Sequence, residues 1–152
     1  MSPAHPEQIV SKAKWLECKS VAYTYIDPVI FREYDIDTAL VCKESSVLSV
    51  AVSAGYDYQN PREELYAVMD VVNIGHKSFS EKFYFGITGA HLEHVLHTFI
   101  YIRNEADIWL EITTLLIPGL NDSNRELDEM TRWINGGLGP DVPIHFTPIT
   151  KC

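Results

Sequence analysis

Apolar residues follow two alternating patterns along the chain, and this alternation predicts strands and helices in turn. Short runs rich in β-branched and aromatic residues predict five buried strands, over residues 20–25, 47–52, 70–74, 108–117 and 143–147. Other segments space their apolar residues three and four positions apart, which is typical of amphipathic helices, over residues 6–18, 28–44, 61–69, 80–84, 91–103 and 122–134. Strands that alternate with helices predict an α/β fold with a parallel sheet.

The length of the chain limits how far such a sheet can close. The strand runs are apolar on both faces, as a sheet covered by helices requires. A complete barrel of eight strand-helix units needs about 250 residues, and this chain has 152. We therefore expect a partial (β/α) barrel of about five parallel strands, which residues 1–152 form as a single domain.

Composition and charge exclude several classes of protein. The chain is 46% hydrophobic, which is too apolar for a disordered protein. Its 12 basic and 21 acidic residues give a net charge of -9, so we expect neither nucleic acid nor an anionic membrane as a partner. No apolar run approaches the roughly 20 residues of a membrane span, and the first residues lack a signal-peptide pattern. We expect a cytoplasmic protein.

Neither the cysteines nor the common catalytic motifs indicate a specific function. Cys18, Cys42 and Cys152 are odd in number and show no CxxC or CxxxCxxC spacing, which favours reduced thiols over disulfides or a metal site. The chain has no GxSxG nucleophile elbow, phosphate-binding loop, GxGxxG fingerprint or HExxH motif. Hydrolase, kinase and dehydrogenase functions therefore lack support.

Candidate functional residues follow the predicted strands. Ligands of parallel α/β sheets bind beyond the carboxyl ends of the strands, where loops and helix N-termini converge. This rule selects Asp27, residues 53–56, His76, Lys77 and His145. Within the fourth predicted strand, Glu111 and Thr113 share one alternating face. Such groups suit a zwitterionic or phosphorylated small molecule.

Each of these candidates also has a structural interpretation. Asp27 precedes a proline, and an aspartate there often accepts backbone N–H bonds in a turn. Lys77 fits a solvated loop, since most lysines are exposed. His145 lies between two apolar residues and fits the core. Gly55 suits the close packing of a turn.

Three histidines at HxxHxxH spacing, His91, His94 and His97, form one cluster on a predicted helix. All three lie within about a third of the helix circumference, as a metal site would require. This flank, however, is opposite the apolar face of the same helix. We expect the histidines to face solvent, without the supporting contacts of a metal site.

Several segments together resemble the radical S-adenosylmethionine (SAM) proteins of the AmmeMemoRadiSam type, relatives of the pyruvate formate-lyase activating enzyme. The resemblance runs in order from about residue 5 to residue 147. The run TTLLIPGLNDS over 113–123 is its most specific part, because it joins a strand, a Pro-Gly turn and a capped helix. The other parts are CKSVAYTY over 18–25, VVNIGHKSF over 71–79, the pairs at 83–84 and 89–90, and the pair at 145–146.

The resemblance implies a partial (β/α)6 barrel and radical chemistry. In such proteins a CxxxCxxC loop after the first strand binds three irons of a [4Fe-4S] cluster, and the fourth iron binds SAM. Reduction then cleaves SAM to a 5′-deoxyadenosyl radical. The five predicted strands would correspond to the second to sixth strands of that barrel. The resemblance implies SAM-binding roles for Asp27, Ser53, Lys77 and His145.

This chain departs from the family pattern at the cluster loop, since no CxxxCxxC sequence is present. We therefore expect no cluster to bind to this chain alone, and no radical cleavage of SAM by it. The Asn-Glu-Pro of the family is replaced by Ile-Asp-Pro at 26–28, Thr-Asn-Gly by Ser-Ala-Gly at 53–55, and Asp-Leu-Lys by Gly-His-Lys at 75–77.

Two explanations fit these departures. The chain is a fragment of a radical SAM protein whose preceding segment carried the cluster loop, or it is a degenerate homologue that acts as a non-catalytic module for binding a small molecule or a protein. In the first case an unpaired edge strand would favour dimerisation.

Overall fold

Five parallel strands form one open sheet, and helices connect them. The computed structural model describes residues 4–24, 27–56 and 59–149. In chain order the elements are α1 (Pro6–Trp15), β1 (Ser20–Tyr23), α2 (Arg32–Glu44), β2 (Leu48–Ser53), α3 (Gln59–Tyr66), β3 (Val71–His76), α4 (Glu81–Phe83), a π-helical turn (Tyr84–Thr88), α5 (Leu92–Glu105), β4 (Trp109–Leu116), α6 (Asn124–Gly137) and β5 (Ile144–Pro148).

The strands pair in the order in which they occur along the chain, β1-β2-β3-β4-β5, and every pair is parallel. The register aligns Val52 with Asn73, Asn73 with Glu111, and Thr113 with His145. Residues aligned in this way point to the same side of the sheet. The predicted α/β fold, an open parallel sheet of five strands, is confirmed.

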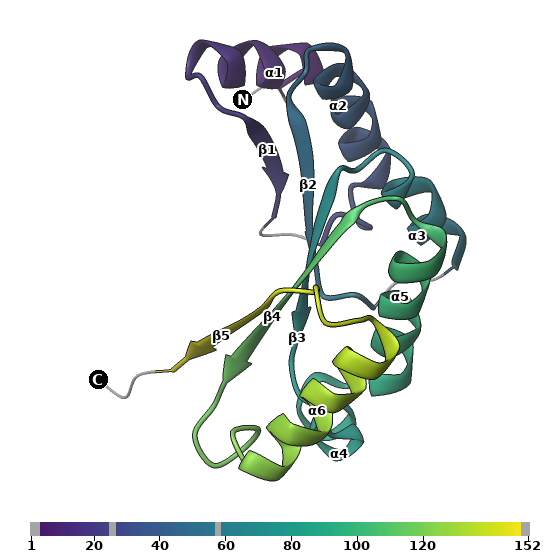
Figure 1. The fold of residues 1–152 in the computed structure, drawn as a ribbon. Coiled ribbons are helices and arrows are strands. Elements are labelled where there is room, and N and C mark those ends of the chain that lie inside the picture. Colours follow the sequence, from purple (N-terminus) through teal and green to yellow (C-terminus); the bar gives the residue numbers. More distant parts are fainter. Residues whose placement is uncertain (1–3, 25–26, 57–58, 150–152) are drawn as a thin grey trace.

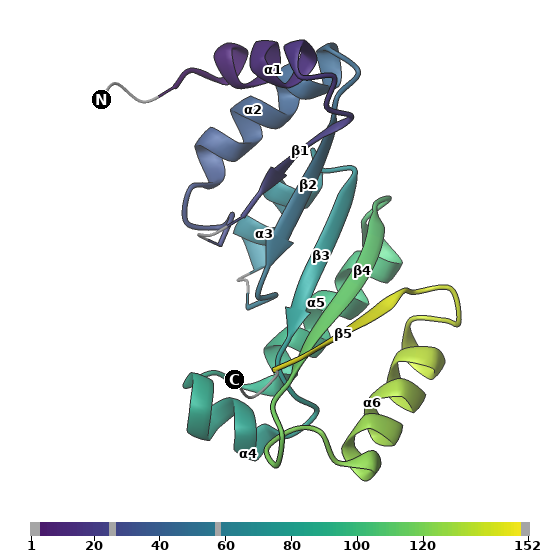
Figure 2. The ribbon, with the colours of Figure 1, turned by 90° about the vertical axis from the view of Figure 1, so that its left-hand side faces the viewer.

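In the described part of the chain, helices cover one face of this sheet. Figure 1 shows α2, α3, α5 and α6 on its outer, convex side, and Figure 2 views the sheet from the opposite side, with the helices behind it. The core lies between sheet and helices, and its fully buried side chains include Leu65, Val72, Ile74, Val95, Phe99, Ile102, Ile112 and Met130. In the described part of the chain, no helix is both long enough and apolar enough to cross a bilayer.

The other face of the sheet carries no helix among the described residues (Figure 2). We call it the concave face and define it by the alternate strand residues that point to this side. Apart from Ser20, its members toward the amino ends of the strands are apolar, whereas most of its polar side chains begin halfway along the strands. The concave face consists of Ser20, Ala22, Leu48, Val50, Val52, Val71, Asn73, Gly75, Trp109, Glu111, Thr113, Leu115, His145 and Thr147.

Two predicted boundaries were wrong for identifiable reasons. The second helix begins at Arg32 and not at Pro28, because the intervening residues form a turn in which Ile30 N–H donates to the Asp27 carbonyl at 2.9 Å. The third strand continues through Gly75 and His76, which pair with Thr113 and Thr114 of β4. Gly75 does not end β3, because β4 continues to pair with β3 beyond this residue.

Asp35, in the first turns of α2, is a buried carboxyl group at 8% exposure. Burial raises its pKa from 3.8 to about 6. A raised pKa means that the folded protein favours the protonated acid, so stability is highest below the ordinary aspartate pKa and falls as the pH rises through about 6. Asp35→Asn should therefore raise the free energy of unfolding by about 2 to 3 kcal/mol at pH 8 and by little at pH 3.5.

Urea denaturation at the two pH values measures this difference. Asp37→Asn is the matched control, because Asp37 lies on the same helix and is exposed. A gain for Asp35→Asn that is equal at both pH values would contradict the prediction.

Candidate functional site

Asp27 and Ser53 meet at the carboxyl edge of β1 and β2, as their positions after neighbouring strands suggested. The Ser53 hydroxyl donates to the Asp27 carboxylate at 3.1 Å, and the Ala54 N–H donates to Asp27 Oδ2 at 2.9 Å. The Gly55 N–H in turn donates to Ser53 Oγ at 2.9 Å. Ser53 is buried on the helix side of the strand end. Much of the hydrogen-bonding capacity of both side chains is thus used in fixing the loop after β2.

Lys77 follows β3, and its side chain folds back over the strand. A Cβ atom built on Gly75 would lie 2.9 Å from Lys77 Nζ and 3.6 Å from the Ser53 carbonyl oxygen. The absence of a side chain at Gly75 therefore gives the ammonium group its place beside the end of β2. Lys77 is exposed, so this ammonium group remains accessible at the same edge as Asp27 and Ser53.

His76 was predicted among the groups beyond the carboxyl end of β3, and this prediction was wrong. The residue lies within the strand and points into the helix layer, where it is 1% exposed and contacts the ring of Phe99. Burial, with the nearby Lys77 charge, lowers its pKa to about 4. Its Nδ1 lies 3.2 Å from the Tyr84 hydroxyl, which accepts the Lys77 N–H at 2.9 Å. A neutral imidazole can accept a hydrogen bond from the Tyr84 hydroxyl. His76 therefore helps to fix the Lys77 backbone, with Tyr84 as the link between them.

Asn121 holds the loops beside the candidate site together, and the sequence did not predict this role. It is 2% exposed, and its amide N–H groups donate to the Lys77 carbonyl at 2.6 Å and to the Leu115 carbonyl at 2.8 Å. Its Oδ1 accepts the Ile117 N–H at 2.7 Å. One side chain thus joins the loop after β3 to the loop after β4. The PGLND sequence was interpreted only as a turn followed by a helix cap, and nothing in it indicated the bond to Lys77.

The same two loops are joined a second time by Glu126 on α6. Its carboxylate accepts the Ser78 hydroxyl and the Phe79 N–H, the latter at 2.8 Å. Ser123 caps α6 by accepting the Glu126 N–H at 3.3 Å, which settles the choice between Asp122 and Ser123 as the cap. Both loops are therefore held to the start of α6.

His145 belongs to a second polar group, on the concave face. Its Nε2 lies 3.3 Å from Glu111 Oε2 on the neighbouring strand. The other oxygen, Glu111 Oε1, accepts the Trp109 indole N–H at 3.2 Å. Asn73 aligns with Glu111 across β3 and β4 and was missed from the sequence, although the alternation that placed Glu111 and Thr113 on one face applies equally to β3. His145 lies two strands away from Lys77, so the four predicted site residues form two groups and not one.

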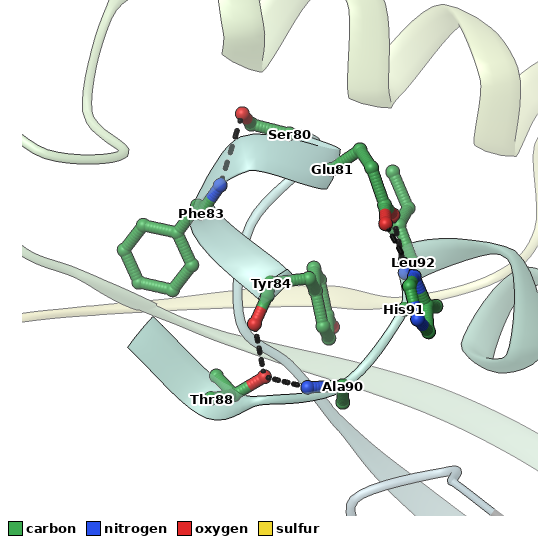
Figure 3. A network of polar contacts seen from close by, with 8 residues as sticks. All are labelled: Ser80, Glu81, Phe83, Tyr84, Thr88, Ala90, His91 and Leu92. Carbon is green, nitrogen blue, oxygen red and sulfur yellow. Dashed lines mark hydrogen bonds and ion pairs between the residues drawn. The ribbon is translucent and has the colours of Figure 1, made fainter. Parts of the chain in front are cut away.

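The three histidines of the HxxHxxH motif are exposed along α5, as predicted. His91 Nδ1 lies 2.6 Å from Glu81 Oε1, and Glu81 Oε2 accepts the Leu92 N–H at 2.9 Å, so this carboxylate caps α5 (Figure 3). These bonds, with that to His91 first, lower the pKa of Glu81. His97 lies 3.8 Å from Glu93. Among the described residues, no three His, Cys, Asp or Glu side chains are placed to hold one metal ion.

The two described cysteines, Cys18 and Cys42, do not fit a [4Fe-4S] cluster. Cys42, near the C-terminal end of α2, is fully buried with Val10 and Val47 in a small apolar cluster. Cys18 is exposed and precedes β1. Both lie toward the amino ends of the strands, opposite the edge that carries Asp27 and Lys77, and Cys152 lies outside the described residues. The donor set at the candidate site is oxygen and nitrogen, whereas such clusters are bound by thiolates.

Comparison with known sequences gives one informative relative. No protein-family model matches the chain. An uncharacterized protein of Methanocaldococcus jannaschii is 32% identical over 142 residues, which cover 93% of this chain and 41% of that protein. The chain therefore spans about two fifths of the length of this relative.

Comparison with solved structures identifies the fold. A domain of the pyruvate-formate lyase-activating enzyme from Bacteroides vulgatus superposes with a TM-score of 0.68 at 17% identity, covering 83% of this chain and 74% of that chain. A radical SAM methyltransferase from Sphaerobacter thermophilus gives 0.70 at 12% identity, covering 94% and 45%. SuiB from Streptococcus suis, in a structure with bound SAM, gives 0.77 at 12% identity, covering 100% and 35%. The fold is thus that of the partial barrel found in radical SAM enzymes.

Proposed function

We propose that this chain is a SAM-binding portion of a radical SAM-type protein, that SAM binds across the carboxyl half of the concave face, and that the chain does not cleave SAM by itself. The observation that carries the proposal is the distribution of polar groups. Lys77 follows the end of β3, and Asn73 and His145 belong to a polar band that crosses the concave face from about the middle of β3 and β4 onward. The Asn73 amide has no hydrogen-bond partner among the described residues, and before this band the concave face is apolar apart from Ser20. The fold and the SAM-bound neighbour support it.

The chemistry of these groups suits the parts of SAM. The Lys77 ammonium is a donor for the methionine carboxylate, and the His145 imidazole and Asn73 amide offer donors and acceptors for the adenosine part. Asp27 and Ser53 shape the loop beside Lys77, and the remaining lone pairs of the Asp27 carboxylate suit an ammonium group. Where a reduced [4Fe-4S] cluster is present, SAM supplies a 5′-deoxyadenosyl radical. The cysteines described above do not fit a cluster, so no radical step is assigned to this chain.

Isothermal titration calorimetry of the chain with SAM tests the proposal. We expect saturable binding to one site, weakened at least tenfold by Lys77→Met and by His145→Asn, since each removes a polar contact at the site. The matched controls are Lys82→Met on α4 and His97→Asn on α5, both exposed and outside the site. These controls should bind SAM like the unmodified chain.

Two results would contradict the proposal. Absence of binding at millimolar SAM would remove the SAM-binding role. Release of methionine and 5′-deoxyadenosine from SAM by this chain, in the presence of a strong reductant, would show that it is catalytic alone.

A second candidate function is a non-catalytic module that binds protein, and the edges of the sheet favour it. Among the described residues, strands β1 and β5 each have a neighbour on one side only. Large apolar side chains such as Trp109 and Leu48 are about half exposed. Unpaired edges and exposed apolar groups favour association. A chain that fails to bind SAM but forms a concentration-dependent dimer in light scattering would support this alternative.

A further inference from the structure

Glu111 is a carboxylate held in a fixed position on an otherwise uncharged part of the concave face. It lies in the third position of β4, between Trp109 and Thr113 on the same face. Its Oε1 accepts the Trp109 indole N–H at 3.2 Å, and its Oε2 lies 3.3 Å from His145 Nε2. Two neighbours therefore orient the group, and its side chain is still 34% exposed.

The charge of Glu111 has no permanent counter-ion among the described residues. Within the described strand segments of the concave face it is the sole carboxylate, and neither a lysine nor an arginine of the described chain pairs with it. Its imidazole neighbour carries charge only when protonated. A carboxylate has about four lone-pair sites, and the two contacts leave others open on the exposed side.

Trp109 adds an aromatic surface beside this charge. The residue is 52% exposed, although tryptophan is usually mostly buried. Its N–H points to Glu111, so the edge of the indole is fixed while its face remains available. Indole faces attract organic cations, and more strongly than other aromatic rings. The polar Asn73 amide lies across from Glu111 on β3 and has no hydrogen-bond partner among the described residues.

We propose that Trp109, Glu111 and His145 form a binding site for the ammonium or guanidinium group of a small organic molecule. The cation lies against the indole face and donates hydrogen bonds to the free lone pairs of Glu111, and His145 holds the carboxylate from the other side. A phosphate or carboxylate ligand would be repelled by Glu111. A metal ion would find one carboxylate and one imidazole, which are too few ligands.

This site shares His145 with the proposed SAM site, whereas Trp109 and Glu111 belong to it alone. Trp109 aligns with Val71, six residues before Lys77, and strands rise about 3.3 Å per residue. The indole and the Lys77 backbone are thus separated by roughly 20 Å along the sheet. Substitutions at Trp109 and Glu111 leave Lys77 and the shared His145 in place, so loss of cation binding can be told apart from loss of SAM binding, and the test below omits SAM because SAM itself is cationic.

The test uses n-butylguanidinium and the neutral isostere n-butylurea, each titrated into the isotopically labelled chain. The probe signal is the indole N–H resonance of Trp109, assigned by its disappearance in Trp109→Phe. The titrations are run near pH 8, above the ordinary range of histidine protonation. We expect the guanidinium ligand to shift this resonance saturably and to bind at least fivefold more tightly than the urea.

Two variants and one control complete the experiment. Glu111→Gln keeps the size of the side chain and should weaken guanidinium binding at least tenfold while leaving n-butylurea binding unchanged. Trp109→Leu should weaken it at least fivefold, followed through the His145 resonances. The control Glu93→Gln, an exposed carboxylate on α5, should have no effect. Equal binding of the two ligands, or an equal loss in Glu93→Gln, would overturn the proposal, provided that circular dichroism shows all variants folded.

Discussion

Asn121→Ala should lower the free energy of unfolding by about 3 kcal/mol or more, the largest loss that we expect from a polar substitution in this chain. The residue is buried, and its side chain satisfies the Ile117 N–H and the carbonyls of Lys77 and Leu115. Alanine leaves these part-buried backbone groups without that partner, and a backbone group left unsatisfied away from water costs about 1 to 3 kcal/mol. Urea denaturation measures the loss.

Two further variants separate the hydrogen bonds from the volume of the side chain. Asn104→Ala, at an exposed position of α5, should change stability by no more than about 0.5 kcal/mol. Asn121→Asp keeps the acceptor for Ile117 but turns a carboxylate oxygen toward two carbonyls. Protonation relieves this repulsion, so the variant should gain stability relative to the unmodified chain as the pH falls. A loss below about 1 kcal/mol for Asn121→Ala would contradict the role assigned to this residue.

Gly55→Ala should lower the free energy of unfolding by about 2 to 4 kcal/mol, for two reasons that add. Gly55 has a φ of +73°, in the left-handed region that costs an L-residue about 1 to 2 kcal/mol. A Cβ atom would also lie 2.8 Å from Cγ2 of Ile74, a fully buried β-branched side chain. Overpacking of this kind costs about 1 to 3 kcal/mol.

Gly89→Ala isolates the backbone contribution. Gly89 has nearly the same φ, +71°, and a Cβ atom built there meets nothing within 4 Å. The Gly89→Ala variant should lose only about 1 kcal/mol of the free energy of unfolding in the same denaturation experiment. If both variants lose the same amount, the contact with Ile74 contributes nothing and the packing argument fails.

The strands could be predicted from the sequence because β-branched runs such as 47–52 are short, apolar and bounded by turn residues. The side to which each strand residue points was harder to predict. In a parallel sheet both faces tend to be apolar, so alternation does not reveal which residues face the helices. His76 shows the result: it was predicted in the loop beyond β3, but it is the last residue of that strand and is buried in the helix layer.

The contacts at the candidate site also divide into those that the sequence could predict and those that it could not. The meeting of Asp27 with Ser53 follows from the rule that carboxyl ends of neighbouring strands share one edge, and 26 residues separate them. The bond from Asn121 to the Lys77 carbonyl spans 44 residues and follows from no local pattern. The placement of Trp109 beside Glu111 could have been predicted, because Trp109 lies two positions before Glu111 and thus on the same face of the strand.

The strands lie in the sheet in the same order as in the chain. This order has a consequence for folding during biosynthesis. Each new strand pairs with the strand that was synthesised just before it, so every pairing closes a loop of modest length and none waits for a distant segment. A nascent chain can extend this sheet outward from β1 as residues leave the ribosome. Strand β5 is then the last to join and, with β4 as its one partner, should be the first to exchange its amide hydrogens.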